Sequence, residues 1–346
     1  MGRQKKILEP VTTIEDEEVI RNINFERPQI SLGSHPVETG KYLLATNMIF
    51  DLYRKICLWI DNRTPGAMFY GRPRLGKTKA IEYIKLILPQ KFGSNIQIFH
   101  VTSRKHKTVN EDKFFSHFLN QVGHNITTQG PAYAKRERLT NYLIDKVDSS
   151  GQNKLIIFVD EAQLFTDLEY EWLMDIHNEL NRFDINMTFI LVGQEELKFQ
   201  RTAFLEAKKS QIIGRFMVNE YQFKGAENAV DIKNCLIGYD HAEFPINSGW
   251  SYTKYYFPEA YTAGHKLEEC ADELFEVYVE TRREFNLMRK KFDIPMQYLK
   301  STIENALRIF GANGDNLFWL TKSDWRVAIE NSGYINAELY QNKLED

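Results

Sequence analysis

The sequence predicts a three-layer α/β fold, in which a parallel five-stranded sheet carries helices on both faces and is followed by a helical region. Short apolar runs alternate with helix-like periodicity up to about residue 225, and beyond that point the alternation stops. A glycine-rich segment follows the first apolar run, and an acidic pair follows the third. Because ligands bind at the carboxyl ends of parallel strands, both features are expected at one edge of the sheet.

Five strands are expected, at about 67–70, 96–101, 154–159, 187–192 and 217–223. The stretch 155–159 is apolar throughout, which is typical of a central parallel strand buried on both faces. Apolar residues at spacings of three and four predict helices around these strands, and Pro89 is expected to end the second helix. These helices are expected at 42–60, 77–88, 114–122, 139–147 and 168–180.

The glycine-rich segment at 71–78, which we call the P-loop, fits the pattern G-x-x-x-x-G-K-[ST] between a strand and a helix. Its glycines let successive N–H groups point at phosphate oxygens, and the helix N-terminus adds partial positive charge. Lys77 would reach the β- and γ-phosphates, and the Thr78 hydroxyl would bind Mg²⁺. A plain glycine-rich turn is the alternative. The residues expected to bind the nucleotide here are Gly71, Pro73, Arg74, Leu75, Gly76, Lys77 and Thr78.

The third strand ends in Asp160 and Glu161. Asp160 is expected to hold Mg²⁺ and Glu161 to polarise the water that attacks the γ-phosphate, although an acidic turn is the alternative. Gln194 follows the fourth strand and would lie beside these acids if the two strands are adjacent and parallel. It would then sense the γ-phosphate or orient the water, unless it is a plain hydrogen-bonding loop residue. The sequence therefore predicts an ATPase with ATP and Mg²⁺ as cofactors.

Three regions are expected along the chain. Residues 1–40 are polar and predict an N-terminal arm, either a partly ordered surface arm or one that docks on a partner or a neighbouring subunit. Residues 41–225 form the nucleotide-binding core, and 226–346 form a helical lid whose tail, from Asn336, is polar. Around 238–264 the lid has an aromatic-rich insertion, which we interpret as local core, with a binding surface as the alternative. Lid helices are expected at 226–237, 266–291, 294–310 and 324–331.

Composition narrows the class of protein. With 44 basic and 47 acidic residues the net charge is −3, so any basic surface for nucleic acid must be local. Three cysteines lie far apart, which argues against a disulfide framework or a zinc site. The N-terminus has no apolar run typical of a signal peptide, and no stretch approaches a membrane span. We therefore expect a soluble cytoplasmic protein that does not bind membranes.

The combined motifs resemble those of the AAA+ ATPases. Residues 71–78 are similar to Walker A, 159–162 to Walker B and 191–194 to the sensor-1 strand, while the segment around Arg215 is similar to the one that carries the arginine finger. The resemblance implies an AAA+ P-loop NTPase core with a C-terminal helical lid and ATP bound between subunits. Arg215 would then act in trans on a neighbour's γ-phosphate. Its alternative is a surface or intramolecular ion pair.

Within the AAA+ proteins the chain is most similar to the TnsC/TniB family of DNA transposition regulators, on residues 71–78, 159–163 and 192–197. That resemblance implies a bacterial cytoplasmic protein that oligomerises as a ring or filament on duplex DNA and links a target-selection protein to the transposase. Many relatives carry a sensor-2 arginine on the lid, but the corresponding stretch 294–299 has none. Either Gln297 substitutes weakly or the lid is less tightly coupled to the γ-phosphate.

Several residues lie where relatives present DNA-contacting elements, and they would contact phosphates independently of base sequence and in a salt-sensitive way. A solvated run of charges is the alternative interpretation. The candidates are Arg104, Lys105, Lys107, Thr127, Thr128, Lys135 and Arg136. Two other functions remain open: a nucleotide-switched signalling or scaffold ATPase that does not bind DNA, and a helicase or initiator loader of the AAA+ class.

Overall fold

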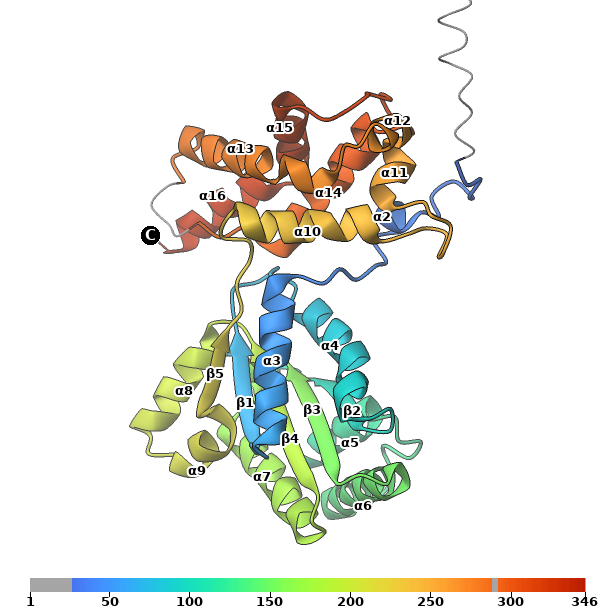
Figure 1. Ribbon diagram of the computed structural model, residues 1–346. Helices are drawn as coiled ribbons and strands as arrows, with labels where there is room; N and C mark the ends of the chain where they lie inside the picture. Colours follow the sequence, from blue (N-terminus) through green and yellow to red (C-terminus); the bar gives the residue numbers. More distant parts are fainter. Residues whose placement is uncertain (1–26, 288–291, 346) are drawn as a thin grey trace, which may run out of the picture.

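The computed structural model describes residues 27–287 and 292–345, so most of the expected N-terminal arm lies outside the described residues. Figure 1 shows an α/β part that contains the sheet, with a layer of helices stacked above it. We call the helical layer, residues 226–287 and 292–345, the lid. No helix in the described parts of the chain is long and apolar enough to cross a membrane.

The described residues form one parallel sheet with the strand order β2-β3-β4-β1-β5. This confirms the expected parallel five-stranded sheet. Because β3 and β4 are neighbours and β1 follows β4, the carboxyl ends of these strands lie side by side at one edge. The strands are β1 (Gly66–Tyr70), β2 (Gln97–Thr102), β3 (Lys154–Asp160), β4 (Asn186–Gly193) and β5 (Asn219–Gln222).

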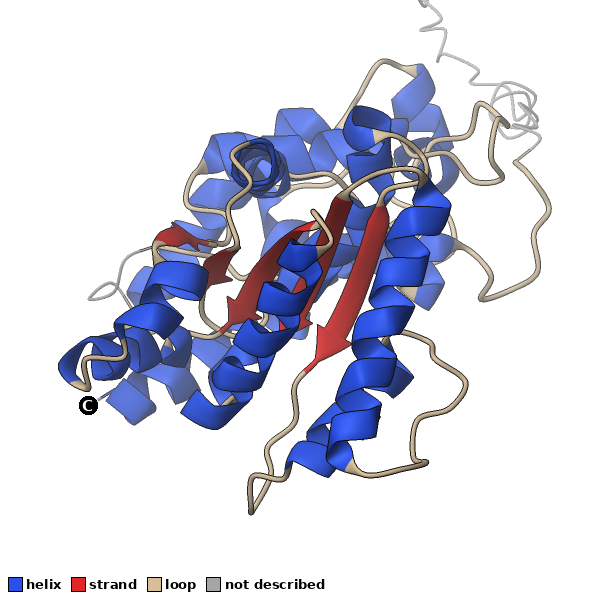
Figure 2. Ribbon diagram, turned by 90° about the horizontal axis from the view of Figure 1, so that it is seen from below, coloured by secondary structure: helices blue, strands red, loops and turns tan. Residues whose placement is uncertain are grey.

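Helices cover both faces of the sheet, as seen in Figure 2. Alternate side chains of a strand point to opposite faces. Phe69 and Phe158 accordingly pack with α3 and α4, whereas Met68 and Ile157 pack with α5, α6 and α7. The covering helices are α3 (Asn47–Asp61), α4 (Lys77–Phe92), α5 (Glu111–Gln121), α6 (Ala132–Ser150) and α7 (Asp167–Arg182), and α8 (Glu196–Glu206), α9 (Ser210–Ile212) and the turns η1 (Ala162–Leu164) and η2 (Ile213–Met217) complete this part.

Several ends of elements differ from the sequence expectation. Helix α3 begins at Asn47, because Thr46 is extended and its hydroxyl accepts a hydrogen bond from the Ile49 N–H as a cap. Residues 41–46 therefore lie outside the helix, without regular secondary structure. Helix α4 continues through Pro89, which lies in its last turn and does not end it. The last strand is shorter than expected because a π-helical turn, η2, occupies the residues before it.

The other shift concerns α6, which begins at Ala132, seven residues earlier than expected. Pro131 holds the extended conformation of an N-cap, and the next residues complete the helix without a break. Lys135 and Arg136 therefore lie on a helix that packs against α5 and α7. This change of element decides where their side chains point.

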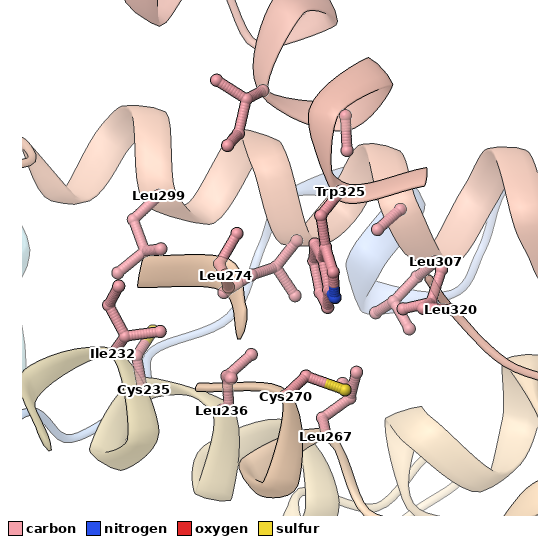
Figure 3. Packing of buried hydrophobic residues seen from close by; sticks show 14 of the residues in the cluster. Ile232, Cys235, Leu236, Leu267, Cys270, Leu274, Leu299, Leu307, Leu320 and Trp325 are labelled. Atoms are coloured by element: carbon pink, nitrogen blue, oxygen red, sulfur yellow. The ribbon is translucent and has the colours of Figure 1, made fainter. Parts of the chain in front are cut away.

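The lid has a hydrophobic core of its own. Figure 3 shows Trp325 among Leu274, Leu307 and Leu320, and the indole is fully buried. The aromatic-rich stretch contributes buried side chains to this core, in keeping with its interpretation as local packing. The lid elements are α10 (Ala229–His241), α11 (Tyr252–Tyr256), α12 (Pro258–Thr262), η3 (Leu267–Cys270), α13 (Ala271–Glu284), α14 (Met296–Phe310), α15 (Lys322–Asn331) and α16 (Tyr334–Glu345).

Two segments join the lid unexpectedly. The tail expected to be polar chain from Asn336 is helix α16, because Tyr334 and Ile335 are buried against the lid core and give it an apolar face. Before the sheet, the short helix α2 (Pro36–Thr39) also packs on the lid through Val37. The division of the chain into arm, core and lid at residues 40 and 225 stays a prediction. All three cysteines are buried free thiols.

His35 anchors α2 to the lid. Its side chain is 0% exposed, its Nδ1 accepts a hydrogen bond from the Val37 N–H at 3.2 Å, and its ring stacks on Tyr255 with centroids 4.5 Å apart. Burial, and to a smaller extent the nearby Arg27 guanidinium, lowers the pKa of His35 to about 4. In the unfolded chain the pKa of His35 is 6.5. Between pH 6.5 and about pH 4 the unfolded chain therefore protonates His35 more readily than the folded chain does.

We expect the melting temperature to fall as pH drops from 7 towards 4.5, and to fall less in His35→Asn. Asparagine keeps an oxygen that caps α2 but cannot titrate. At pH 5 the proton taken up by His35 on unfolding should account for about 2 kcal/mol of the lost stability. Calorimetry at pH 7 and pH 5 measures the difference, with the exposed His106→Asn as control. An identical pH dependence in wild type and His35→Asn would contradict this role.

Candidate active site

The P-loop connects β1 to α4, and glycine is required at both ends of its turn. A Cβ atom at Gly71 would collide with the carbonyl oxygen of Phe223. Gly76 has a φ of 93°, which is unfavourable for a residue with a side chain, and it directly precedes the first residue of α4. The chain therefore curls tightly into the N-terminus of a helix, where free N–H groups favour an anion.

Lys77 is buried inside this loop. Its ammonium donates hydrogen bonds to the carbonyl oxygens of Gly71 and Arg72, at 2.7 and 2.9 Å. Burial lowers the pKa of Lys77, although the carboxylates of Glu161 and Asp160 oppose that effect. The loop thus holds a cation that its own carbonyls stabilise and that phosphate oxygens would stabilise in the same way.

Thr78 and Asp160 meet across the site. The Thr78 hydroxyl donates to Asp160 Oδ2 at 2.7 Å, and Oδ1 accepts the backbone N–H of Glu161 at 3.0 Å. Burial alone would raise the pKa of Asp160, but these two hydrogen bonds and the His100 imidazole, 3.8 Å away, lower it. A hydroxyl beside an ionised carboxylate is the set of hard oxygen ligands that Mg²⁺ prefers, so these residues fit the metal.

Glu161 belongs to a cluster with two glutamine side chains. Its carboxylate accepts a hydrogen bond from Gln163 Nε2 at 2.6 Å and lies 3.5 Å from Gln194 Nε2. Gln163 in turn accepts the backbone N–H of Gln194 at 3.3 Å. The pairing of β3 with β4 therefore brings Gln194 to the acids, as expected. The sequence alone assigned no role to Gln163. The one indication of a role was its amide side chain two residues after Glu161.

A cavity of about 440 Å³ joins these groups at the junction of the α/β part and the lid. Its lining combines apolar side chains with the charged and polar groups of the P-loop and the strand ends. Such a mixed lining suits a ligand with an apolar base and a charged tail. Apolar and aromatic side chains come from Tyr42, Leu43, Leu44, Ile49, Phe223, Tyr239 and Met296, and the P-loop and strand ends contribute Pro73, Arg74, Leu75, Gly76, Lys77, Thr78, Asp160, Glu161 and Gln194.

The lid wall of this cavity carries a cation that sequence reasoning missed. Lys300 lies on α14 one turn after Gln297, and both line the cavity. The Lys300 ammonium donates to the Gly40 carbonyl oxygen at 2.9 Å and lies 4.3 Å above the ring of Tyr42. The stretch 294–299 has no arginine, yet a lysine follows it directly on the same helix.

Arg215 lies outside the residues that line the cavity. It belongs to η2, and its guanidinium donates to Asn178 Oδ1 and, at 3.5 Å, to the carbonyl oxygen of Met174 on α7. Burial first, and then Arg215, lowers the pKa of the adjacent His177 to about 4, which keeps this imidazole neutral near pH 7. The structure therefore places the Arg215 side chain against α7, and its action on a neighbour's nucleotide stays a prediction.

The expected DNA-binding residues fall into two groups. Arg104, Lys105 and Lys107 are exposed on the loop between β2 and α5, and no ion-pair partner for them occurs within residues 27–287 and 292–345. Thr127 and Thr128 lie on the loop between α5 and α6, and the second of them is exposed. These five residues are placed where they can contact a partner.

The other two candidates are engaged within the fold. Lys135 is 3% exposed, and its ammonium lies 2.7 Å from Asp112 Oδ1. Arg136 pairs with Glu111 at 2.7 Å and with Asp175 at 2.9 Å. Both residues therefore join α6 to its neighbouring helices. The expected phosphate contact of Lys135 is wrong for this structure, because α6 starts early enough to turn that side chain inward.

Comparisons with known proteins agree with this geometry. Residues 62–200 match the protein family described as an AAA domain, and no curated protein sequence matches the chain. The chain is similar to the ORC2 protein of Aeropyrum pernix in its ADPNP–ADP complexes, with 14% identity and a TM-score of 0.56 over 86% of this chain and 71% of that one. The ADP form of that protein gives 14% identity and a TM-score of 0.53, over 85% and 71%.

The chain has the AAA+ P-loop fold. The expected fold class is thereby confirmed. The TnsC/TniB resemblance is finer than these findings and stays a prediction.

Glu161→Gln should bind ATP nearly as tightly as the wild type but hydrolyse it about a hundredfold more slowly or worse, because an amide cannot take up the proton of the attacking water. Phosphate release in a single turnover measures hydrolysis, and a fluorescent nucleotide measures binding. Glu206→Gln, an exposed carboxylate at the far end of α8, is the control and should leave both unchanged. Undiminished hydrolysis in Glu161→Gln would remove Glu161 from this role.

Proposed function

We propose that this chain is an ATP-dependent, DNA-binding AAA+ regulator of DNA transposition, whose nucleotide state controls its assembly on duplex DNA. The observation that carries the ATPase part is the single cavity in which Lys77, Thr78, Asp160 and Glu161 converge between the α/β part and the lid. A ligand there touches both parts, so its presence can alter how they sit together. The partners would be duplex DNA, further copies of the chain, a target-selection protein and a transposase.

The placement of the side chains supports the following roles. Lys77 would hold the β- and γ-phosphate oxygens, and Thr78 with Asp160 would hold Mg²⁺, which neutralises phosphate charge when bound. Glu161 would accept the proton of the attacking water. Gln163 would keep the Glu161 carboxylate oriented through its hydrogen bond. Gln194, which follows β4 and lies beside Glu161, would sense the γ-phosphate or orient the water. Each of these groups is hydrogen-bonded to a neighbouring side chain or backbone group.

DNA binding would use the exposed loop between β2 and α5. Its basic side chains are free to reach phosphates, unlike Lys135 and Arg136, which are ion-paired within the fold. With a net charge of −3 the chain as a whole does not attract DNA, so attraction must come from such a local patch. The contacts would be independent of base sequence and weakened by salt.

The double variant Arg104→Glu/Lys105→Glu should bind duplex DNA more weakly and lower the slope of log affinity against log salt by about two, since each lost phosphate contact removes roughly one unit. Fluorescence anisotropy over a salt series measures this slope. The matched control is Arg54→Glu/Lys55→Glu, the same pair of residues exposed on α3, which should leave the slope unchanged. Equal loss in both variants would argue for a general charge effect and against this loop.

A second test of the proposed function measures assembly on DNA. With ATP and duplex DNA, the wild-type chain should form rings or filaments in electron micrographs, and Lys77→Ala should form none. Persistent monomers of the wild type under these conditions would refute the proposed regulator. Absence of DNA binding even at low salt would favour the signalling or scaffold ATPase.

Arg215 would complete a neighbour's site in trans. Arg215→Ala subunits and Lys77→Ala subunits should each be nearly inactive alone, because an arginine finger contributes about 10³–10⁵ in rate. Mixing them should restore part of the hydrolysis, since some interfaces then join an intact P-loop to an intact Arg215. Steady-state hydrolysis across mixing ratios measures the recovery. No recovery in mixtures shown to co-assemble would assign Arg215 only to its contacts on α7.

A second function is favoured by one observation. The similarity in fold to an ORC2 protein is what an initiator or loader of the AAA+ class would also give. The two functions share the ATPase and DNA steps and differ in the protein partner. Recovery of replication proteins, rather than a transposase, with ATP-bound Glu161→Gln would favour the initiator or loader.

A further inference from the structure

One residue of the P-loop is bonded directly to the lid. Arg72 donates from Nε to Asp293 Oδ2 at 3.1 Å and from Nη1 to Glu338 Oε1 at 2.8 Å, and its Nη2 donates to the Asp293 carbonyl oxygen. Asp293 lies just before α14, and Glu338 lies on α16. The partners are 221 and 266 residues away in sequence. A single guanidinium in the P-loop therefore bridges two separate segments of the lid.

The two acids that accept hydrogen bonds from Arg72 are themselves bonded to other groups of the fold. Glu338 is about 4% exposed, and its other oxygen accepts a hydrogen bond from Arg282 Nη1 at 3.1 Å. Arg282 is almost fully buried and also donates to the Tyr334 hydroxyl at 2.8 Å. Asp293 Oδ1 accepts the Gly225 N–H at 2.6 Å. Separating Arg72 from these groups would leave its largely buried guanidinium without its two acidic partners, which is costly.

The backbone of the same residue touches the phosphate-binding lysine. Lys77 donates to the carbonyl oxygens of Gly71 and Arg72, so Arg72 is bonded through its main chain to Lys77 and through its side chain to the lid. A second connection runs beside it. Arg74 donates from Nη1 to the Tyr298 hydroxyl at 2.5 Å, and its carbonyl oxygen accepts the Gln297 N–H at 3.2 Å. Both connections reach the lid from the P-loop.

We propose that Arg72 is a positioning residue that transmits occupancy of the P-loop to the lid, through Glu338 on α16 and Asp293 before α14. The proposal rests on nucleotide binding in the cavity described above. When phosphate oxygens replace the carbonyl oxygens of Gly71 and Arg72 as acceptors for the Lys77 ammonium, these carbonyls lose their donor. The loop then rearranges around the phosphates. The lid follows, because its buried acids remain paired with Arg72.

In this arrangement the connection between the site and the lid is made by a P-loop arginine and not by a lid arginine. The stretch 294–299 offers the site no arginine, whereas the P-loop offers the lid two, Arg72 and Arg74. A ligand shifts a conformation only when it interacts differently with the two states. Here the difference lies in whether Lys77 is bonded to the loop carbonyls or to phosphate.

The test is hydrogen exchange of the full-length chain with and without Mg²⁺ and a slowly hydrolysed ATP analogue. In the wild type, peptides from α16 should exchange about fivefold or more slowly with the analogue, the lower end of typical coupling between sites. Arg72→Gln should bind the analogue through the unchanged backbone of the P-loop but lose this slowing. Arg72→Lys, which keeps the charge but cannot bridge both acids, should restore part of it.

The control is Arg326→Gln, which breaks an exposed ion pair with Glu284 within the lid and should keep the wild-type slowing. Glu338→Gln and Asp293→Asn cut the same connection from the lid side, and they give the decisive measurement if Arg72→Gln binds no nucleotide. Retained slowing in variants that bind the analogue overturns the proposal, as does a wild type that binds without any change in α16. A wild type that binds no nucleotide overturns the proposed function itself.

Discussion

The close approach of three backbone segments beside the P-loop is the constraint on which the rest of the site depends. Gly71 leaves no room for a Cβ against the Phe223 carbonyl, and Gly225 leaves none against the Ile294 carbonyl. Ala226 and Ile294 also pair as a short antiparallel bridge. The start of the P-loop, the exit of β5 and the segment before α14 are therefore pressed together. A shift of the P-loop would therefore press directly on the chain that enters the lid.

Periodicity and parallel strand order were enough to predict the chemical edge of the site. Asp160 ends one strand, Lys77 and Gln194 come after the ends of two others, and parallel strands bring such ends to one edge. The contacts that connect this edge to the lid could not be found in the same way. Arg72 and Glu338 are 266 residues apart, and Glu338 lies in a tail whose polar composition hid the buried face of Tyr334 and Ile335. Long-range pairing of charges leaves no local pattern.

The sequence also does not reveal which basic residues are engaged within the fold. Lys135 and Lys105 are indistinguishable by composition, but Asp112 faces the first and no acid among the described residues pairs with the second. What separates them is the start of α6 at Ala132, which turns Lys135 towards α5. Helix boundaries are the least certain part of a sequence interpretation, and here the boundary decides which cations can reach a phosphate. The exposed basic surface is thus smaller than the sequence suggests.

Coupling between the P-loop and the lid acts from the nucleotide to the lid and from the lid to the nucleotide. Linkage requires that a ligand which alters the lid and a nucleotide which alters the P-loop change each other's affinity by the same factor. If the lid is positioned from Arg72, a partner that binds α16 will alter nucleotide affinity without touching the cavity. The acids on the lid and the cation on the P-loop then make the nucleotide site a sensor of what the lid binds, as well as the reverse. The proposed assembly on DNA with recruitment of partners would use both directions.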